Sequence, residues 1–298
     1  MNYRQEMSKI SGIVNKHIAE FTKVDSSIIT SDIDFTKAGQ LLSLNNLDIF
    51  FKVFNIKVPS LKNSTKSFFH YKRFDRAYEF VEKDFIRLSA LSNFRNVNNG
   101  DDIKEYEHFF DVAKIGTNQS FVDQQKDNYF IFCLTEDNCT ERFWKEYADD
   151  KKGLCLELEI IDKQSPMFDL NKICYDDGLE FQFFADMQNE IHSTFGKYLL
   201  TQGLSKFAAF YKRKTKEDGS EGFAWERETR LLVNWGMYAN QLKDFSFENY
   251  NGYKSLQIPF DNSLFSINLK SVTLGENLTP DQKQKIENLL KQKNITIK

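Results

Sequence analysis

The sequence predicts an α+β fold, with mixed or antiparallel sheets and peripheral helices, and three observations lead to this prediction. Aromatic residues make up 15% of the 298 residues and include 29 Phe and 12 Tyr, which favour sheets. Only 4 Pro are present, which favours regular elements over long coil. Helical and strand patterns follow one another without a regular βαβ rhythm, so a doubly wound parallel sheet is not expected.

Residues 1–60 are expected to form a small N-terminal helical region. Apolar residues at helical spacing predict an amphipathic helix from Gln5 to Thr22; they are Met7, Ile10, Val14, Ile18 and Phe21. The run LLSLNNLDIFFKVFNIKV at 41–58 predicts a second helix or a helix–strand pair. The polar stretch after Pro59 is typical of a linker.

The main α+β domain is expected to cover residues 68–298. Alternating or continuous apolar runs predict its strands, which are FFHYKRF (68–74), NYFIFCLTE (128–136), GLCLELEI (153–160), AWERETRLLVNW (224–235), SLQIPF (255–260) and LFSINLKSVTLG (264–275). Helices are expected at EYEHFFDVAK and at 140–148, and a long helical stretch from about Asp177 to Lys212 is expected to break near Gly196 and Gly203. A last helix is predicted to begin after Thr279, with Pro280 in its first turn and Gln282 completing a capping box.

Composition and charge narrow the classes of partner. The net charge of −3 and a pI near 5.9 give no overall attraction to nucleic acid, so no nucleic-acid partner is expected. No apolar run reaches the roughly 18 residues of a membrane span, and the first residues lack the apolar core of a signal peptide. The expected location is the cytoplasm, or another cell reached by a route without an N-terminal signal.

Several common catalytic signatures are missing. The four cysteines form no CxxC pair and the four histidines form no HExxH or HxH pattern, so no metal is expected. Glycine-rich nucleotide-binding signatures and GxSxG are missing as well. What remains is a set of polar residues on three predicted strands or at their ends.

The first two groups could bind a ligand. His70, Tyr71 and Arg73 lie on the first strand, where His and Arg are suited to grip a phosphate or an adenosine ribose; the alternative is a strand with an exposed basic edge. Thr135 ends a buried strand, and Trp144 and Tyr147 follow on one side of a short helix. These aromatic side chains either belong to the core or form the wall of a small-molecule cleft.

The third group is the pair Glu226 and Glu228. Both would point to the same face of a strand, because side chains alternate along strands. One interpretation is an exposed polar face with cross-strand ion pairs. The other is a pair of carboxylates that meets a developing positive charge, such as an oxocarbenium-like transition state in the cleavage of a glycosidic bond.

The order of several blocks resembles a bacterial family catalogued as domain of unknown function 2971. The blocks, which span residues 68–290, are HYKRF, FIRLSALSNFRNVN, FCLTED, FWKEYADDKKGLCLEL, WERETRLLV and VTLGENL. The same strands are also similar to ADP-ribosyltransferases of the Arg–Ser–Glu type. That resemblance implies that Arg73 or His70 binds NAD and that Thr135 takes the place of the serine. It also implies that Glu228 stabilises the oxocarbenium ion, while Glu226 orients the acceptor.

The expected function is therefore NAD-dependent ADP-ribosyl transfer, a glycosyltransferase reaction, to a macromolecular acceptor. NAD would be the substrate, and a toxin, an effector or a phage-defence factor would be the biological setting. The acceptor could be a protein, and the N-terminal helix could bind an antitoxin-like partner. The alternatives are a non-catalytic module that binds a ligand or partner, an NAD glycohydrolase, and a metal-dependent nuclease or other hydrolase that uses the carboxylates.

Overall fold

The chain divides into two compact units, each assembled from three segments. The computed structural model describes residues 3–22, 35–38, 41–44, 58–96, 101–112, 125–138, 140–176, 182–200, 204–216, 219–250 and 253–298. The first unit contains Met1–Pro59, Phe94–Lys126 and Ile173–Ala224, and the second contains Ser60–Asn93, Asp127–Lys172 and Trp225–Lys298. The expected division near residue 60 coincides with one of these boundaries, whereas the others have no counterpart in it.

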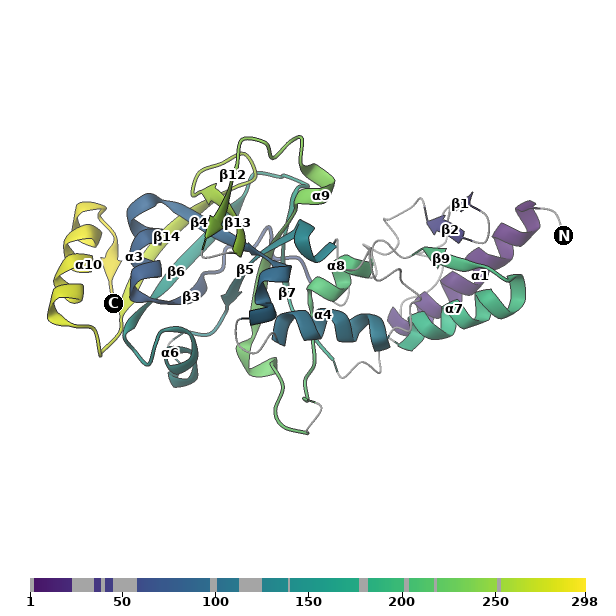
Figure 1. Ribbon diagram of the computed structural model, residues 1–298, viewed down its shortest axis with the longest axis horizontal. Coiled ribbons are helices and arrows are strands. Elements are labelled where there is room, and N and C mark those ends of the chain that lie inside the picture. The colour runs from purple at the N-terminus through teal and green to yellow at the C-terminus, as the bar shows by residue number, and fades with distance from the viewer. Residues whose placement is uncertain are drawn as a thin grey trace. The chain divides into compact units, whose positions relative to one another are not determined.

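The second unit is built on a large, mostly antiparallel sheet (Figure 1). Its strands are β3 (Phe68–Arg73), β4 (Phe85–Ala90), β5 (Tyr129–Thr135), β6 (Gly153–Asp162), β7 (Phe168–Lys172), β11 (Glu228–Asn234), β12 (Ser246–Tyr250), β13 (Tyr253–Pro259), β14 (Phe265–Leu274) and β15 (Thr296–Ile297). Its helices are α3 (Phe74–Lys83), α6 (Glu141–Tyr147), α9 (Trp235–Tyr238) and α10 (Pro280–Gln292). Helices and strands together in this arrangement confirm the predicted α+β fold.

Strand β5 is the branch point of the sheet. The main order is β12-β13-β4-β5-β3-β6-β14-β15, and β11 pairs with both β5 and β7. All of these pairs are antiparallel except β14 with β15. Because β5 lies between β3 and β11, residues more than 150 positions apart in the chain, such as Phe69 and Glu228, pair with the same residue, Thr135.

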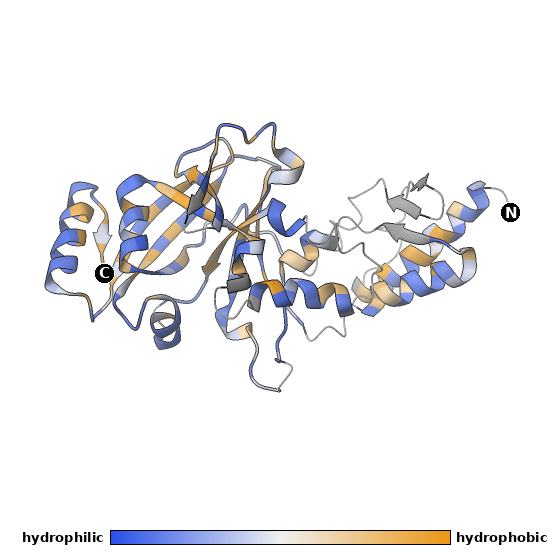
Figure 2. Cartoon of the chain, viewed as in Figure 1, coloured by the Kyte–Doolittle hydropathy of each residue, from blue (hydrophilic) through white to orange (hydrophobic). Residues whose placement is uncertain are grey.

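The main core lies on one face of this sheet. Alternate residues of β6, from Leu154 to Ile160, are buried there, together with Phe132 of β5 and Phe80 of α3. Figure 2 shows hydrophobic residues concentrated along the strands, while α10 carries mostly hydrophilic residues on its outer surface. Helices α3 and α10 pack against each other. The capping box predicted for α10 is present, with Thr279 and Gln282 each accepting a hydrogen bond from the other's backbone N–H.

The first unit consists of helices and short strands. Its elements are α1 (Tyr3–Thr22), β1 (Phe35–Ala38), β2 (Leu41–Leu44), α4 (Asp101–Val112), β8 (Cys174–Tyr175), α7 (Gln182–Phe195), β9 (Tyr198–Leu200), α8 (Leu204–Ala209) and β10 (Tyr211–Lys212), with the 3-10 helix η2 (Leu91–Asn96) at a boundary between the units. Helix α1 packs on α7 through the predicted apolar face, where Ile10, Val14 and Ile18 are fully buried. The Nε2 atom of His17 lies 2.8 Å from Glu190 of α7.

Some predicted elements are wrong at their ends. The strand expected at 224–235 begins only at Glu228, because Ala224–Glu226 form a 3-10 helix, η4. The break expected near Gly196 in the helical stretch 177–212 is confirmed, since α7 ends at Phe195 and Gly196 adopts a φ of +62°, but Tyr198–Leu200 form a strand and not a helix. The break expected near Gly203 lies outside the described residues. The segment 41–44 is a strand rather than the start of a helix, and residues 45–57 of that prediction lie outside the described residues.

Candidate functional site

Thr135 lies at the centre of the polar side chains that the sequence singles out. It ends β5, where it pairs with Glu228 of β11 on one side and with Phe69 of β3 on the other. Side chains of directly paired residues project from the same face of a sheet. Thr135 and Glu228 therefore share the face of Phe69 and Tyr71, which is opposite to the main core.

Glu226 reaches this position by a turn and not by strand alternation. It belongs to η4, and Arg227 after it has a φ of +42°, so the expectation that Glu226 and Glu228 lie on one strand face is wrong. The Thr135 hydroxyl donates a hydrogen bond of 2.8 Å to the carbonyl oxygen of Glu226 and accepts one of 3.0 Å from the Asp137 amide. These two bonds hold the backbone turn that leads from Glu226 to Glu228.

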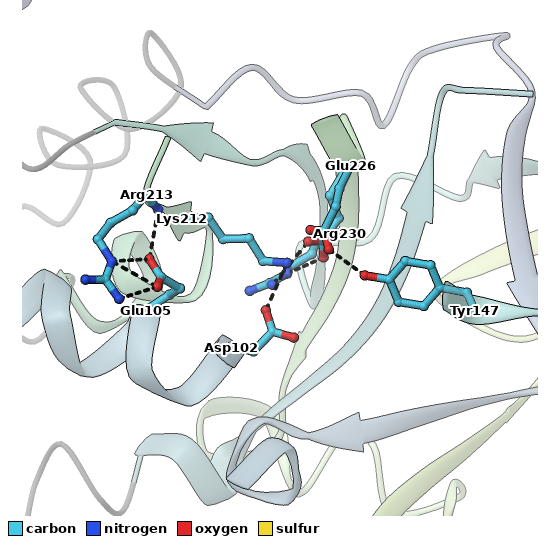
Figure 3. A network of polar contacts seen from close by, with 8 residues as sticks. Asp102, Glu105, Tyr147, Lys212, Arg213, Glu226 and Arg230 are labelled. Atoms are coloured by element: carbon cyan, nitrogen blue, oxygen red, sulfur yellow. Dashed lines mark hydrogen bonds and ion pairs between the residues drawn. The ribbon is translucent and has the colours of Figure 1, made fainter. Parts of the chain in front are cut away.

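The Glu226 side chain is held by a tyrosine. The Tyr147 hydroxyl donates a hydrogen bond of 2.5 Å to Oε1 of Glu226 (Figure 3). Only 6% of Glu226 is exposed, so the contact lies largely out of water. A hydrogen bond to an ionised group in such surroundings is stronger than a neutral one and fixes its orientation.

Glu228 forms a buried ion pair with Arg230 on the same strand. The Nε and Nη2 atoms of Arg230 lie 2.6 Å and 3.3 Å from the two carboxylate oxygens, and the two side chains are 1% and 6% exposed. The guanidinium offsets the cost of burying the carboxylate charge. We call Thr135, Tyr147, Glu226, Glu228 and Arg230 the carboxylate cluster.

An aromatic cluster lies beside it, made of Tyr71, Phe143, Trp144, Tyr147 and Trp225. The ring of Tyr71 stacks on Phe143 at 5.0 Å and meets Trp144 edge-on at 5.3 Å, and Trp225 lies 5.1 Å from Phe143. Tyr71 and Trp144 are buried, whereas Tyr147 and Trp225 are partly exposed. Of the two aromatic residues expected to line a cleft, Tyr147 is thus partly open to solvent, whereas Trp144 belongs to the buried part of the cluster, as does Tyr71.

His70 and Arg73 do not join these residues. His70 projects into the main core, where its ring packs on Phe132 at 4.3 Å and its Nδ1 atom lies 2.9 Å from the carbonyl oxygen of Cys133. Burial, and then the charge of Lys72, hold the pKa of His70 well below its usual value. Arg73 is exposed at the other end of β3, opposite Gly153 and four residues beyond Phe69, or about 13 Å along the strand.

Residues that the sequence analysis did not select complete the site. Arg230 follows Glu228 by two positions, the spacing that places two strand residues on one face, so this spacing was a usable signal. Trp225 directly precedes Glu226. The Arg142 guanidinium lies over its ring, with the Cζ atom 3.8 Å from the ring centre, in a cation–π contact. Arg227 is exposed and lies 2.5 Å from Asp137.

The first unit contains polar contacts of its own, also drawn in Figure 3. Arg213 and Glu105 are joined by bonds of 2.8–3.1 Å that include the backbone amide of Arg213, and Lys212 lies 3.2 Å from Asp102. Both pairs connect β10 and its continuation to α4. Their arrangement within one unit is that of structural ion pairs, which hold a short strand against a helix.

The chain matches no known protein family, no curated protein and no solved structure. Across the residues whose structure is described, no group of three or more His, Cys, Asp or Glu side chains could hold a metal ion. In that same part of the chain, no helix has the length and apolar character needed to span a membrane.

Proposed function

We propose that the protein cleaves the bond between nicotinamide and ribose in NAD and transfers the ADP-ribosyl group to a macromolecular acceptor. The supporting observation is the pairing of Thr135 with Glu228 across adjacent strands, with Glu226 held in the same buried cluster. The resemblance to Arg–Ser–Glu ADP-ribosyltransferases assigns catalysis to Glu228 and Glu226 and gives Thr135 the place of the serine. The resemblance to the family of domain of unknown function 2971 is part of the same proposal.

The proposed reaction separates the roles of the two carboxylates. As the bond from the ribose C1′ to nicotinamide breaks, nicotinamide leaves with the bonding electrons and positive charge develops on the ribose. Glu228, kept ionised by Arg230, stabilises that charge. The acceptor then bonds to C1′, and Glu226, oriented by the Tyr147 hydroxyl, takes the proton that the acceptor loses.

Binding of NAD would use partly exposed groups beside these carboxylates. Tyr147 and Trp225 are partly exposed aromatic rings, and the nicotinamide ring would pack against their exposed parts. Arg227, whose side chain is 60% exposed, supplies a guanidinium for the diphosphate once its contact with Asp137 opens. In this proposal Arg227 takes the role that the sequence comparison gave to Arg73 or His70.

The test follows NAD labelled in the adenylate half through incubation with purified protein and a cell lysate. We expect released nicotinamide and label attached to macromolecules. Glu226→Gln should lower turnover by roughly 100- to 10,000-fold, as expected when a positioned acid–base group is lost, and Tyr147→Phe, which removes the group that orients it, should lower turnover by less. Glu159→Gln is the matched control, because Glu159 lies on β6 and pairs with Lys270 outside the cluster. Thermal melting verifies that each variant is folded.

A non-catalytic binding module is the second candidate, favoured by one observation. Both oxygens of Glu228 already accept hydrogen bonds from Arg230, an arrangement that also suits a purely structural ion pair. Calorimetry with NAD and ADP-ribose distinguishes the two. Binding without nicotinamide release supports the module, and release without label transfer supports an NAD glycohydrolase. If NAD neither binds nor releases nicotinamide, the proposal of an NAD site is refuted.

A further inference from the structure

Lys72 is the residue of the HYKRF block that the proposed function leaves unused. It lies two positions after His70 on β3 and therefore on the same face, toward the main core. Its Nζ atom lies 5.8 Å from the centre of the Phe132 ring, the ring on which His70 also packs. Lys72 is largely, but not fully, removed from solvent. In the described part of the chain, no carboxylate lies within ion-pairing distance of its amine.

The charged groups around Lys72 come from three elements. Arg76 and Glu79 belong to α3, Arg87 to β4, and the Cys133 thiol to β5. Glu79 is shared by other cations: it lies 3.1 Å from Arg87, 3.8 Å from Arg76 and 3.0 Å from Lys83. Arg87 also contacts Glu248 at 3.3 Å. The neighbourhood thus places more positive than negative side chains around an amine that forms no ion pair with the residues that the structure describes.

These surroundings favour the neutral amine. Burial, followed by the charges of Arg87 and Arg76, lowers the pKa of Lys72 to about 8, with Glu79 and Cys133 acting in the opposite direction. At pH 7.4 the fraction of neutral amine is then on the order of 100-fold larger than for an ordinary lysine. Lysines beside an apolar surface and other cations are known nucleophiles in catalysis by imine formation.

His70, on the same face of β3 as Lys72, has a buried nitrogen that also suggests a ligand site. A carbonyl oxygen can only accept a hydrogen bond, so the contact with Cys133 assigns the ring proton of His70 to Nδ1. Its Nε2 atom is then an acceptor, and it is buried with no hydrogen-bond partner among the described residues. Buried polar atoms usually find a partner, and an orphaned one marks a place to look for a ligand or a function.

We propose that Lys72 is a nucleophilic amine that forms an imine with a small carbonyl compound carrying a carboxylate. The neutral amine attacks the carbonyl carbon to give a carbinolamine. This intermediate loses the former carbonyl oxygen as water, which takes both amine protons, and leaves a C=N bond. The excess of positive side chains around Lys72 selects the anionic compound. The inference does not depend on the proposed NAD reaction, because the site lies on the other face of the sheet.

Reductive trapping tests this inference on the unaltered protein. Glyoxylate is added with sodium cyanoborohydride, which delivers hydride to the imine carbon and converts the imine into a stable secondary amine that peptide mass mapping locates. Lys83 is the internal control, since it lies on the neighbouring helix and is paired with Glu79. We expect Lys72 to be modified at least tenfold faster than Lys83 at pH 7.4, with a rate that levels off above pH 8.

Two comparisons complete the experiment. Arg76→Gln removes one of the charges that lower the pKa of Lys72 and should shift the rise in the trapping rate to higher pH. Acetaldehyde, which carries no charge, should label Lys72 several-fold more slowly than glyoxylate. The proposal is overturned if Lys72 reacts no faster than Lys83, if its rate still increases above pH 10, or if acetaldehyde reacts as fast as glyoxylate.

Discussion

The buried pair Glu228–Arg230 gives the sharpest prediction about stability. Replacing Arg230 by Met keeps much of the side-chain volume and removes the guanidinium, which contacts both oxygens of Glu228 at 2.6 Å and 3.3 Å. The side chains of Arg230 and Glu228 are 1% and 6% exposed, so water cannot readily replace the lost partner. Arg230→Met therefore removes the guanidinium that faces both oxygens of a buried carboxylate.

The expected cost follows from this geometry. Breaking a buried ion pair by removing one partner typically costs about 3–5 kcal/mol, whereas replacing both partners by apolar residues is often close to neutral. The unit that holds the pair has about 150 residues, for which each kcal/mol lowers Tm by roughly 2–4 °C. We expect Arg230→Met to lower Tm by roughly 6–20 °C, and the double change Glu228→Leu with Arg230→Met to recover at least half of that loss.

Calorimetry or circular dichroism at pH 7 measures these shifts, with Lys163→Met as the control. Lys163 and Asp261 lie 2.5 Å apart but are 38% and 83% exposed, so their contact should contribute at most about 1 kcal/mol. If Arg230→Met has the same Tm as the wild type, the ion pair does not contribute to stability and the argument from burial is wrong. If the double variant is less stable than Arg230→Met, the loss arises from packing and not from the stranded charge.

Two further predictions concern stability at acid pH and the space for a side chain at two glycines. Hydrogen bonding from Arg87, then from Lys83, lowers the pKa of Glu79 to about 2, so its stabilisation is present above pH 4.5 and is lost as the pH falls toward 2. Glu79→Gln should lower stability by about 2–3 kcal/mol at pH 7 and by little at pH 2, as measured by urea unfolding at both pH values; an equal loss at both would contradict the ionic origin. Gly275→Ala would place a Cβ 2.1 Å from the Lys151 carbonyl oxygen and should cost about 1–3 kcal/mol or more in thermal melting. Gly12→Ala on α1, where nothing lies within 4 Å, should be neutral or stabilising by up to about 1 kcal/mol, and a larger loss there than at Gly275 would refute the steric argument.

Local patterns in the sequence were sufficient for most of the elements that carry the site. The apolar run before Thr135 gives β5. The alternation in GLCLELEI gives β6, and the capping residues before Pro280 give the start of α10. These features depend on neighbouring residues alone, since strand alternation and capping act over two to four positions.

The site was predictable only in part, because a short motif does not show where regular structure begins. Glu-x-Glu was interpreted as two residues of one strand, whereas the positive φ of Arg227 separates a 3-10 turn from β11. His70 was placed with the ligand-binding residues because of its type. Its direction depends on which face of β3 meets the core, and the register with Leu156 decides that.

The sequence by itself determined the α+β class, the strands β5 and β6, and the amphipathic face of α1, because burial patterns with periods of 2 and 3.6 residues are written into the order of the side chains. Only the tertiary structure decided that Thr135 pairs with Glu228, that Tyr147 holds Glu226, and that Arg73 lies opposite Gly153 at the other end of β3. Contacts between residues so distant along the chain follow from strand order and register. Those depend on the packing of the whole sheet and cannot be fixed by any local segment.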